Sequence, residues 1–320
     1  MILAIGNSGS YEFSAFNVVL AELKNKGQEA VLFKQDKCLD GEYLVFETIN
    51  GRVNYRVVID GADYDIEDFS AIWYMKPHLP IKLMQFEPAE YRQFIQNQFR
   101  VMRTSLWSVF QHKKWIDDPW AIEKAENKIY QLTMARKARL AFPDTLVTSD
   151  PVRVKAFYKK YGSNIIIKLL GASPMVNKVL YTNVVTDEHL DNLDTVKMSP
   201  SIFQARIPKA YELRISIVGE EIFPVKINSQ GDDLTSLDWR RKPKLNDFDV
   251  KMEQTSLPKN IEESLKRFMK ILGLRFGCID MIVTPSGDYV FLEINPNGQW
   301  YFVQLHTEAE ISKALAGLLL

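Results

Sequence analysis

Three polar side chains stand out near the C-terminus because they interrupt apolar strands. Asp280 lies within residues 278–283, whereas Glu293 lies within residues 289–294 and Asn295 directly follows. The residues Pro-Ser-Gly-Asp between the two stretches predict an antiparallel hairpin. Side chains alternate faces along a strand, so Glu293 and Asn295 point the same way, and a paired register places Asp280 beside them.

This corner of oxygen ligands suggests a specific chemistry. Two carboxylates and an amide oxygen suit Mg²⁺, which keeps several waters and shares its coordination shell with substrate phosphates. The alternative is that the acids lie on a solvated face of the hairpin. The sequence favours the metal site, because a carboxylate that follows four apolar residues is costly to bury without a cation or hydrogen-bond donors.

Two lysines upstream are placed as phosphate ligands would be. Lys168 directly follows three isoleucines, so it ends a strand, and its ammonium is a compact point charge suited to phosphate oxygens. Residues 169–176 then supply glycine and small residues for a loop that could fold over a nucleotide. Lys128 lies in a helix predicted over residues 121–138. The alternatives are a plain strand end for Lys168 and a surface position for Lys128.

An apolar strand over residues 201–207 is broken by Pro208 and becomes a connector. Backbone N–H and C=O groups in such a connector can recognise adenine, because the edge of a purine pairs with one hydrogen-bond donor and one acceptor at the spacing of peptide groups. The residues assigned to this hinge are Gln204, Ala205, Arg206 and Ile207.

Charged side chains in the next segments could bind phosphate or carboxylate groups. Glu212 and Arg214 lie two residues apart and therefore share one face of a predicted strand. An arginine held by a strand makes a rigid two-pronged clamp. Arg240 and Arg241 follow a tryptophan. Exposed basic pairs are usually solvated, but beside a triphosphate they could neutralise the charge that develops during transfer.

The hydrophobic pattern predicts the elements that position these residues. Residues 1–5, 15–26 and 30–33 predict a strand, a helix and a strand, and the loop GNSGS between the first two lacks a dinucleotide fingerprint. A long helix is predicted over residues 88–111, with its aromatic side chains in the core or in a subunit contact. The expected domains are an N-terminal α/β domain, a central lobe with a lid loop and a C-terminal lobe with the metal site, over residues 1–115, 116–203 and 204–320.

Composition argues against several classes of protein. The 320 residues include 40 basic and 40 acidic side chains, so the formal charge is zero and no nucleic-acid partner is implied. Cys38 and Cys278 match no metal or redox spacing, and no apolar stretch of about 18 residues is present to span a membrane. We therefore expect a cytoplasmic protein with no membrane partner. The four histidines show no ligand spacing and there is no Ser-His-Asp set, which argues against a zinc enzyme or a hydrolase.

Taken in order, these features resemble the ATP-grasp ligases. More narrowly, the segments YELRISIVG, INSQ, LDWR and EINPNGQW resemble the ATP-grasp peptide macrocyclases that mature graspetides such as microviridins. The resemblance implies an α/β (α+β) chain with the ATP-grasp fold. In that fold an N-terminal α/β pre-ATP-grasp domain precedes central and C-terminal lobes that clasp ATP.

The resemblance also implies a reaction and a set of roles. Members of that group use ATP and Mg²⁺ to phosphorylate an Asp or Glu side chain of a precursor peptide. A Ser or Thr hydroxyl or a Lys amine of the same peptide then attacks, which closes an ester or amide ring. Catalysis would consist of positioning and charge stabilisation, without an enzyme nucleophile. The implied metal ligands are Asp280, Glu293 and Asn295. The implied nucleotide ligands are Lys128, Lys168, Gln204, Ala205, Arg206, Ile207 and Glu212. The implied catalytic residues are Arg214, Arg240 and Lys168.

The expected partner is the precursor peptide, whose leader would bind apart from the reacting core. The acidic residues Asp187, Glu188, Asp191 and Asp194 could pair with an arginine of a helical leader, or could form a solvated helix face. The aromatic helix suggests a homodimer. Two other functions stay open, namely a ligase that adds free amino acids, as relatives of glutathione synthetase or of glutamate ligases do, and a non-catalytic nucleotide- or peptide-binding module. The lysines and acids that are present argue against the non-catalytic module, because a site that has lost its activity has no need of buried charges.

Overall fold

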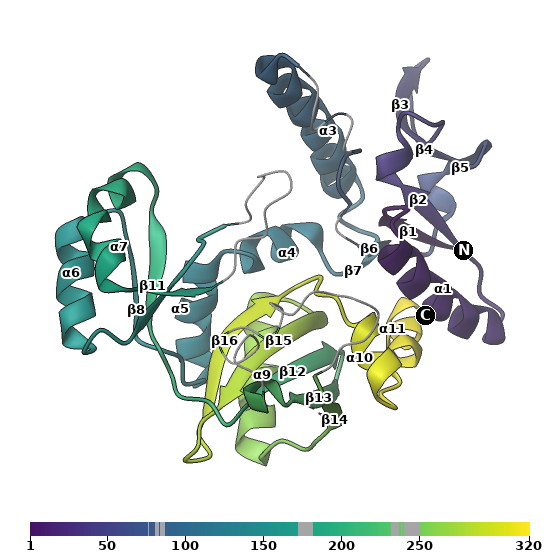
Figure 1. Cartoon of the computed structure of the whole chain (residues 1–320). Coiled ribbons are helices and arrows are strands. Elements are labelled where there is room, and N and C mark those ends of the chain that lie inside the picture. The colour runs from purple at the N-terminus through teal and green to yellow at the C-terminus, as the bar shows by residue number, and fades with distance from the viewer. Residues whose placement is uncertain are drawn as a thin grey trace.

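The computed structural model of the chain describes residues 1–75, 77–80, 83, 87–171, 182–231, 237, 239 and 250–320, which form four sheets (Figure 1). One sheet is parallel and the other three are antiparallel, so the mixed α/β class predicted from the sequence is confirmed.

The parallel sheet forms the N-terminal unit, with strand order β2-β1-β6-β7. Its strands are β1 (Ile2–Gly6), β2 (Ala30–Lys34), β6 (Ala71–Tyr74) and β7 (Lys114–Ile116). Helix α1 (Ser10–Asn25) begins five residues earlier than predicted, and it packs its apolar side chains against alternate residues of β1. The remaining residues of β1 face the opposite core, which explains why this strand reads as a continuous apolar run.

A three-stranded antiparallel sheet lies beside it, made of β3 (Tyr43–Ile49), β4 (Arg52–Ile59) and β5 (Ala62–Asp65). Asn50 and Gly51 connect the first two strands with φ angles of 52° and 76°. Positive φ at both positions is the geometry that an Asn-Gly hairpin turn requires, and β3 and β4 pair as an antiparallel hairpin.

Helix α3 (Ala89–Val109) corrects one expectation about the core. Leu106 and Trp107, near its C-terminal end, are buried against the N-terminal unit, whereas the side chains of Tyr91 and Phe94 are 53% and 61% exposed. Figure 1 shows the first turns of α3 projecting from the body of the molecule. Of the two places predicted for these aromatic side chains, the core is therefore wrong for Tyr91 and Phe94, because only the last turns of the helix pack against the sheets. The subunit contact stays a prediction.

The central sheet has the order β10-β9-β11-β8. Its strands are β8 (Thr145–Thr148), β9 (Ile165–Lys168), β10 (Asn183–Val184) and β11 (Ser201–Ala205). Helices α6 (Pro151–Lys160) and α7 (Asp187–Asp191) cover its outer face (Figure 1). The predicted lid falls mostly on residues 172–176, which lie outside the described residues.

The C-terminal sheet is antiparallel, with the order β14-β13-β12-β15-β16. Its strands are β12 (Tyr211–Val218), β13 (Glu221–Ile227), β14 (Met252–Gln254), β15 (Phe276–Val283) and β16 (Tyr289–Asn295). Helix α9 (Lys259–Leu272) packs on one face, and α10 (Tyr301–His306) and α11 (Ile311–Leu319) join this sheet to α1 through a shared core.

Residues 121–138 form two helices rather than the single predicted one. Helix α4 (Pro119–Ala125) ends before Asn127, whose side chain accepts a hydrogen bond from the Tyr130 N–H (3.0 Å) and caps α5 (Lys128–Ala138). Both helices share a core with α9 and β16. Residues assigned to the central lobe from the sequence thus pack on the C-terminal sheet.

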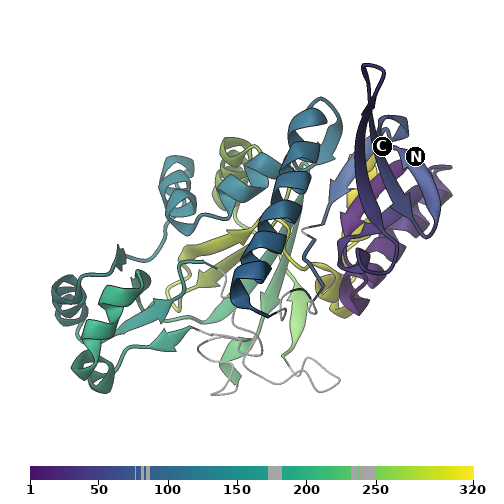
Figure 2. The same cartoon turned by 90° about the horizontal axis from the view of Figure 1, so that it is seen from above.

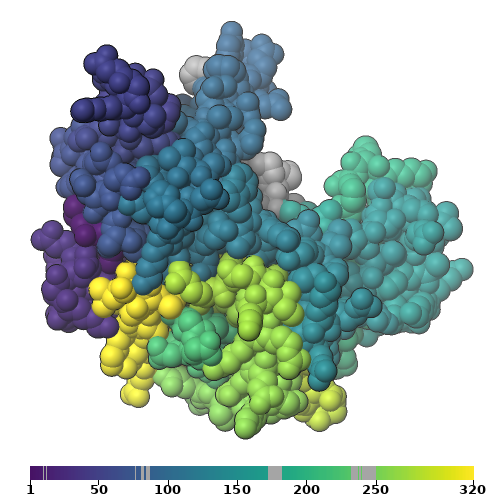
Figure 3. Space-filling model, turned by 180° about the vertical axis from the view of Figure 1, so that it is seen from behind, coloured from purple at the N-terminus to yellow at the C-terminus, as the bar shows by residue number. Residues whose placement is uncertain are grey.

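Figures 1 and 2 place the N-terminal unit and the central sheet at opposite ends of the molecule, with the C-terminal sheet between them. From behind, the space-filling view shows a hollow between α3 and the central sheet with its helices (Figure 3). Within the described residues, none of the helices combines the length and the apolar composition that a membrane span needs.

A buried acid joins the N-terminal unit to the C-terminal sheet. Asp117, directly after β7, accepts hydrogen bonds from the N–H groups of Arg275 (3.0 Å) and Phe276 (2.8 Å), where β15 begins. Its side chain is 2% exposed, and burial raises the pKa of this carboxyl from 3.8 to about 6.

Candidate functional site

Alternation along the C-terminal sheet separates its core face from a polar face. Leu213, Ile215, Ile279 and Met281 enter the core beneath α9. The residues between them turn to the opposite face, where Glu212 and Arg214 of β12 lie beside Ile282 and Asp280 of β15.

A β-bulge determines which side of β16 carries its polar residues. Met281 pairs with Phe291, but Asp280, the residue before Met281 in β15, pairs with Glu293, so Leu292 is an extra residue in β16. Phe291 is fully buried in the core. Without the extra residue, simple alternation would turn Glu293 to that same core face. The bulge places it opposite Asp280 instead.

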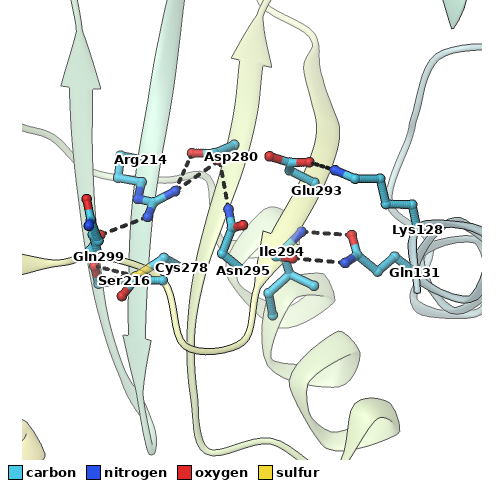
Figure 4. A network of polar contacts seen from close by, with 11 residues as sticks. Lys128, Gln131, Arg214, Ser216, Cys278, Asp280, Glu293, Ile294, Asn295 and Gln299 are labelled. Atoms are coloured by element: carbon cyan, nitrogen blue, oxygen red, sulfur yellow. Dashed lines mark hydrogen bonds and ion pairs between the residues drawn. The ribbon is translucent and has the colours of Figure 1, made fainter. Parts of the chain in front are cut away.

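The three predicted metal ligands lie together on this face (Figure 4). The Nδ2 atom of Asn295 donates to Asp280 Oδ2 at 3.2 Å, and Asp280 faces Glu293 across the β15–β16 ladder. Lys128 Nζ contacts Glu293 Oε2. The predicted register of the hairpin is confirmed, and the side chains of Asp280, Glu293, Asn295 and Lys128 form one corner.

Arg214 is held firmly next to this corner. Its Nη1 donates to both oxygens of Asp280, at 2.9 and 3.0 Å, and its Nη2 donates to the Gln299 carbonyl at 2.8 Å. Burial alone would lower the pKa of Arg214, but the neighbouring Asp280 carboxylate outweighs burial, and the pKa is raised. Arg214 Nε has no acceptor among the described residues, the kind of orphan donor that an added anion or water would satisfy.

The donor set fits a magnesium ion. The side chains of Asp280 and Glu293 are 20% and 18% exposed, so each carboxylate is fixed by the fold yet within reach of water. No three His, Cys, Asp or Glu side chains gather as a metal cluster in the described ranges. A cation here would take two carboxylates and the Asn295 amide oxygen, and would draw its other ligands from water and phosphate, as Mg²⁺ does.

A second buried ion pair on the same face was not predicted. Lys209 Nζ lies 2.7 Å from Glu212 Oε1 and 3.1 Å from the Leu237 carbonyl, and the two side chains are 9% and 11% exposed. Burial raises the pKa of Glu212, and Lys209 opposes that rise. The lysine stands three residues before Glu212, but spacing alone does not distinguish this pair from a solvated one.

The central sheet presents its own polar face. Ile165 and Phe203 enter the small core under α6 and α7, so Lys168 and Gln204 point to the opposite side. Gln204 is 3% exposed and donates through Nε2 to Thr145 Oγ1 at 2.9 Å. Its Oε1 has no donor among the described residues.

Two backbone N–H groups of the predicted hinge already donate hydrogen bonds within the protein. The Ala205 N–H donates to the Asp144 carbonyl (2.9 Å), and the Arg206 N–H donates to the Asn164 carbonyl (3.0 Å). The Arg206 side chain is exposed, and Ile207 lies beyond the end of β11. Of the predicted hinge residues, Gln204 and Ile207 therefore have the polar groups best placed for a ligand.

The predicted site residues thus fall into two groups. Lys128, Asp280, Glu293 and Asn295 form the corner, with Arg214 and Glu212 on the same face of the C-terminal sheet. Lys168, Gln204 and Ala205 belong to the central sheet, and Arg206 and Ile207 directly follow its strand β11. Arg240 lies outside the described residues. Two residues that the sequence did not single out as site residues, Lys209 and Gln131, contact the site through buried hydrogen bonds.

Comparisons with known proteins agree with this geometry. The family model described as "MvdD pre-ATP grasp domain" matches residues 1–123. The macrocyclase MdnC of Microcystis aeruginosa MRC, solved bound with the precursor peptide MdnA, is 31% identical, with 100% of this chain and 99% of that chain covered at a TM-score of 0.85.

Two further solved structures resemble the chain along its length. A RiPP-associated ATP-grasp ligase of Chryseobacterium gregarium, in complex with ADP and a leader and core peptide, is 28% identical, covers 99% of this chain and 96% of its own, and has a TM-score of 0.85. The macrocyclase MdnB of Microcystis aeruginosa MRC is 27% identical, with coverage of 100% and 98% and a TM-score of 0.81. No protein of curated function matches the chain.

Proposed function

Since this chain belongs to the ATP-grasp macrocyclase family, we propose that it is an ATP-dependent ligase that closes side-chain rings in a ribosomally made precursor peptide. The observation that carries the proposal is the corner of Asp280, Glu293 and Asn295, found in a chain that aligns over its whole length with the macrocyclase MdnC. The expected architecture is an N-terminal pre-ATP-grasp domain followed by two lobes that clasp the nucleotide. The packing of α4 and α5 supports counting residues 116–138 with the C-terminal lobe.

In this proposal Asp280, Glu293 and Asn295 hold Mg²⁺ through their oxygens. The bound ion would draw electron density from the phosphate oxygens of ATP. Lys128 and Lys168, from the two lobes, would pair with those phosphates as compact cations. The contact between Lys128 and Glu293 supports this, because it places an ammonium group next to a proposed metal ligand.

We propose that the hinge binds adenine. Gln204 Oε1 is a buried acceptor without a donor, and the Ile207 N–H has no acceptor among the described residues. A purine edge offers one donor and one acceptor, so these two groups would serve it. Ala205 and Arg206 would contact adenine through van der Waals packing and their carbonyl groups, because their N–H groups already donate hydrogen bonds within the protein. Glu212 would lie near the nucleotide from the other lobe.

The chemistry needs no enzyme nucleophile. A carboxylate oxygen of the peptide attacks the γ-phosphorus, the bond to the bridging oxygen breaks, and ADP leaves. The hydroxyl or amine of a second side chain then attacks the acyl carbonyl and loses its proton, and phosphate departs as the ring closes. The residues of the chain supply positioning and positive charge. Lys168 and Arg240 would neutralise the transferred phosphoryl group, and Arg214 would fix Asp280 and add charge beneath the corner.

The precursor's leader would bind on the central lobe. A hollow of about 570 Å³ opens beside α7, and Tyr158 and Asp187, which are joined by a hydrogen bond of 2.9 Å, are among the residues that line it. Asp191 and Asp194 continue the acidic surface. Lys155 and Lys159 also line the hollow, so side chains of both charges surround it. The exposed Asp191 and Asp194 support pairing with a basic residue of a leader that inserts side chains into the hollow. MdnC and the Chryseobacterium ligase are each solved with a peptide.

We also propose a homodimer in which α3 contacts a second copy. Tyr91, Phe94 and Val101 lie along one exposed side of the helix. Replacing Phe94 with Asp should shift the chain to a monomer in light scattering, and an unchanged mass would refute the proposed α3 contact.

Use of ATP also supports action in the cytoplasm.

The function is tested by incubating the chain with ATP, Mg²⁺ and a peptide that carries a leader and a core. We expect one ADP for each ring and the loss of one water in peptide mass for each ring. A core whose Ser, Thr and Lys residues are replaced with Ala is the matched control, and it should lose no water. ADP release stimulated by a free amino acid, with no change in the peptide, would favour the amino-acid ligase. Nucleotide binding without ADP release for any acceptor would favour a binding module.

A further inference from the structure

Strand β16 lies at the edge of the C-terminal sheet, and its outer side is covered in an unusual way. An edge strand exposes backbone N–H and C=O groups that have no neighbouring strand. At Ile294 the side chain of Gln131 takes the place of that strand, because Gln131 Nε2 donates to the Ile294 carbonyl (2.9 Å) and Gln131 Oε1 accepts from the Ile294 N–H (3.0 Å). A hydrogen-bonded residue pair in an antiparallel sheet exchanges the same two bonds.

The Gln131 side chain has no freedom to move away from this contact. It is 3% exposed, and its Nε2 also donates to the Ala125 carbonyl at 2.8 Å, so the amide is held at three points. The close view shows the two parallel hydrogen bonds between Gln131 and Ile294 (Figure 4). Gln131 stands three residues after Lys128 on α5, so one side of this helix contacts both the carboxylate of Glu293 and the adjacent peptide.

The contact between Gln131 and Ile294 matters because Ile294 lies between two of the proposed metal ligands. Ile294 separates Glu293 from Asn295, and the extra residue Leu292 lies just before them. A one-residue slip in a strand turns every following side chain to the opposite face. On the other side of the bulge, the Phe291 N–H donates to the Ala141 carbonyl at 2.7 Å. The bulge is therefore held from both sides along its outer edge.

We propose that Gln131 is a positioning residue for the metal site. By holding the Ile294 peptide beyond the bulge, it maintains the register that turns Glu293 and Asn295 toward the cation. The inference rests on the proposed function, because it assigns Gln131 a role in forming that same corner.

The experiment measures Mn²⁺ binding to the chain in the presence of ADP by electron paramagnetic resonance, with Mn²⁺ standing in for Mg²⁺. In Gln131→Met the side chain keeps its length but loses all three hydrogen bonds. We expect the Mn²⁺ dissociation constant to rise about 10- to 100-fold, as when other partners that orient metal ligands are removed. ADP binding without metal should stay within about twofold, since the hydrogen bonds of Gln131 go to the Ala125 carbonyl and to the Ile294 backbone on the outer edge of β16.

The matched control is Met134→Ala, which removes a buried side chain from the same helix but no hydrogen bond to β16. It should lower the thermal midpoint at least as much as Gln131→Met and leave the Mn²⁺ dissociation constant within about twofold, because loss of packing on α5 does not release the Ile294 peptide.

A second variant gives a signature that loss of packing cannot produce. In Gln131→Glu, the ionised carboxylate would face the Ile294 and Ala125 carbonyls, whereas the protonated form can donate to one of them and accept from the Ile294 N–H. Mn²⁺ affinity of Gln131→Glu should therefore improve, relative to the wild type, as the pH falls. Carboxylate ligands alone predict the opposite direction, because they lose metal when protonated.

Two outcomes are decisive. If the wild-type chain binds Mn²⁺ with ADP and Gln131→Met binds it equally well, the positioning role is overturned and the proposed function is untouched. If the wild-type chain binds no Mn²⁺ with ADP, the proposed function is overturned and this inference with it.

Discussion

Replacing Gly298 with Ala should disrupt the corner through direct contact. A Cβ atom at this position would lie 2.6 Å from Cys278 Cβ and 2.9 Å from both Arg214 Nη2 and Asn295 Cβ. Favourable carbon contacts are roughly 3.5–4.0 Å, so the closest overlap approaches 1 Å. Two of the three neighbours are Cβ atoms fixed directly to β15 and β16, and the third belongs to a guanidinium held by Asp280.

To relieve this overlap, the backbones of β15 and β16 must shift, because two of the atoms in the way are Cβ atoms rather than the ends of flexible side chains. Overpacking of rigid neighbours costs about 1–3 kcal/mol, and we expect a loss near the upper end, about 3 kcal/mol, in the free energy of unfolding. A shift of about 1 Å in reacting groups can cost about 100-fold in rate. The rate of ADP formation with peptide should therefore fall by about 100-fold even where the variant is fully folded.

The assay pairs urea unfolding, followed by circular dichroism, with ADP release well below the unfolding transition. Gly317→Ala in α11 is the control, because among the described residues no atom outside its chain neighbours and the backbone of its own helix lies within 4 Å of the added Cβ. It should raise stability by about 0.5–1 kcal/mol, as Ala does in a helix, and keep full activity. Wild-type stability and activity in Gly298→Ala would refute the claim that this turn is packed tightly against the metal ligands.

Three further predictions concern other parts of the chain. Glu293→Gln and Asn295→Ala should each abolish ADP formation while circular dichroism stays native, and full activity in both would place the metal elsewhere. Asp117 has a folded-state pKa of about 6 against an ordinary 3.8, so the folded chain holds this proton more tightly. Its stabilising contribution is fully present below about pH 4 and is lost as the pH rises through 6, by up to about 3 kcal/mol. Urea unfolding of Asp117→Asn should lack that dependence, and a parallel pH profile for wild type and variant would contradict the assignment. Combined reversal of Asp191 and Asp194 to Lys should weaken peptide binding at least about tenfold in calorimetry and leave ATP binding unchanged, whereas unchanged peptide affinity would remove the leader surface from the account.

The hairpin of the corner was predictable from residue types because its signals are local. Turn residues separate two β-branched runs, and alternation places Glu293 and Asn295 on one face. The presence of Asp280 on that same face depends on the bulge. The bulge at Leu292 was not predictable, since a single extra residue in a short apolar run leaves no periodic trace. The cap at Asn127 was visible in the sequence, as an asparagine directly before Lys128, and it would have divided the predicted helix.

Other features depend on tertiary contacts that no local pattern contains. The aromatic period of α3 indicates one apolar side, but not that Phe94 stays exposed while Trp107 is covered. Likewise, a glutamine within a helix gives no sign that it will complete the edge of a distant strand, as Gln131 does at Ile294. Residues whose partners lie far along the chain are therefore the ones that sequence patterns miss.

The most direct test of the account is a crystal structure of the chain grown with ADP and Mn²⁺, with the metal located by its anomalous scattering. We expect one strong peak between the ADP phosphates and the side chains of Asp280, Glu293 and Asn295. It should lie within about 2.0–2.6 Å of oxygens from these residues, which is the distance range of oxygen ligands to such cations. A bound nucleotide whose metal is held by other residues, or an anomalous peak far from this corner, would contradict it.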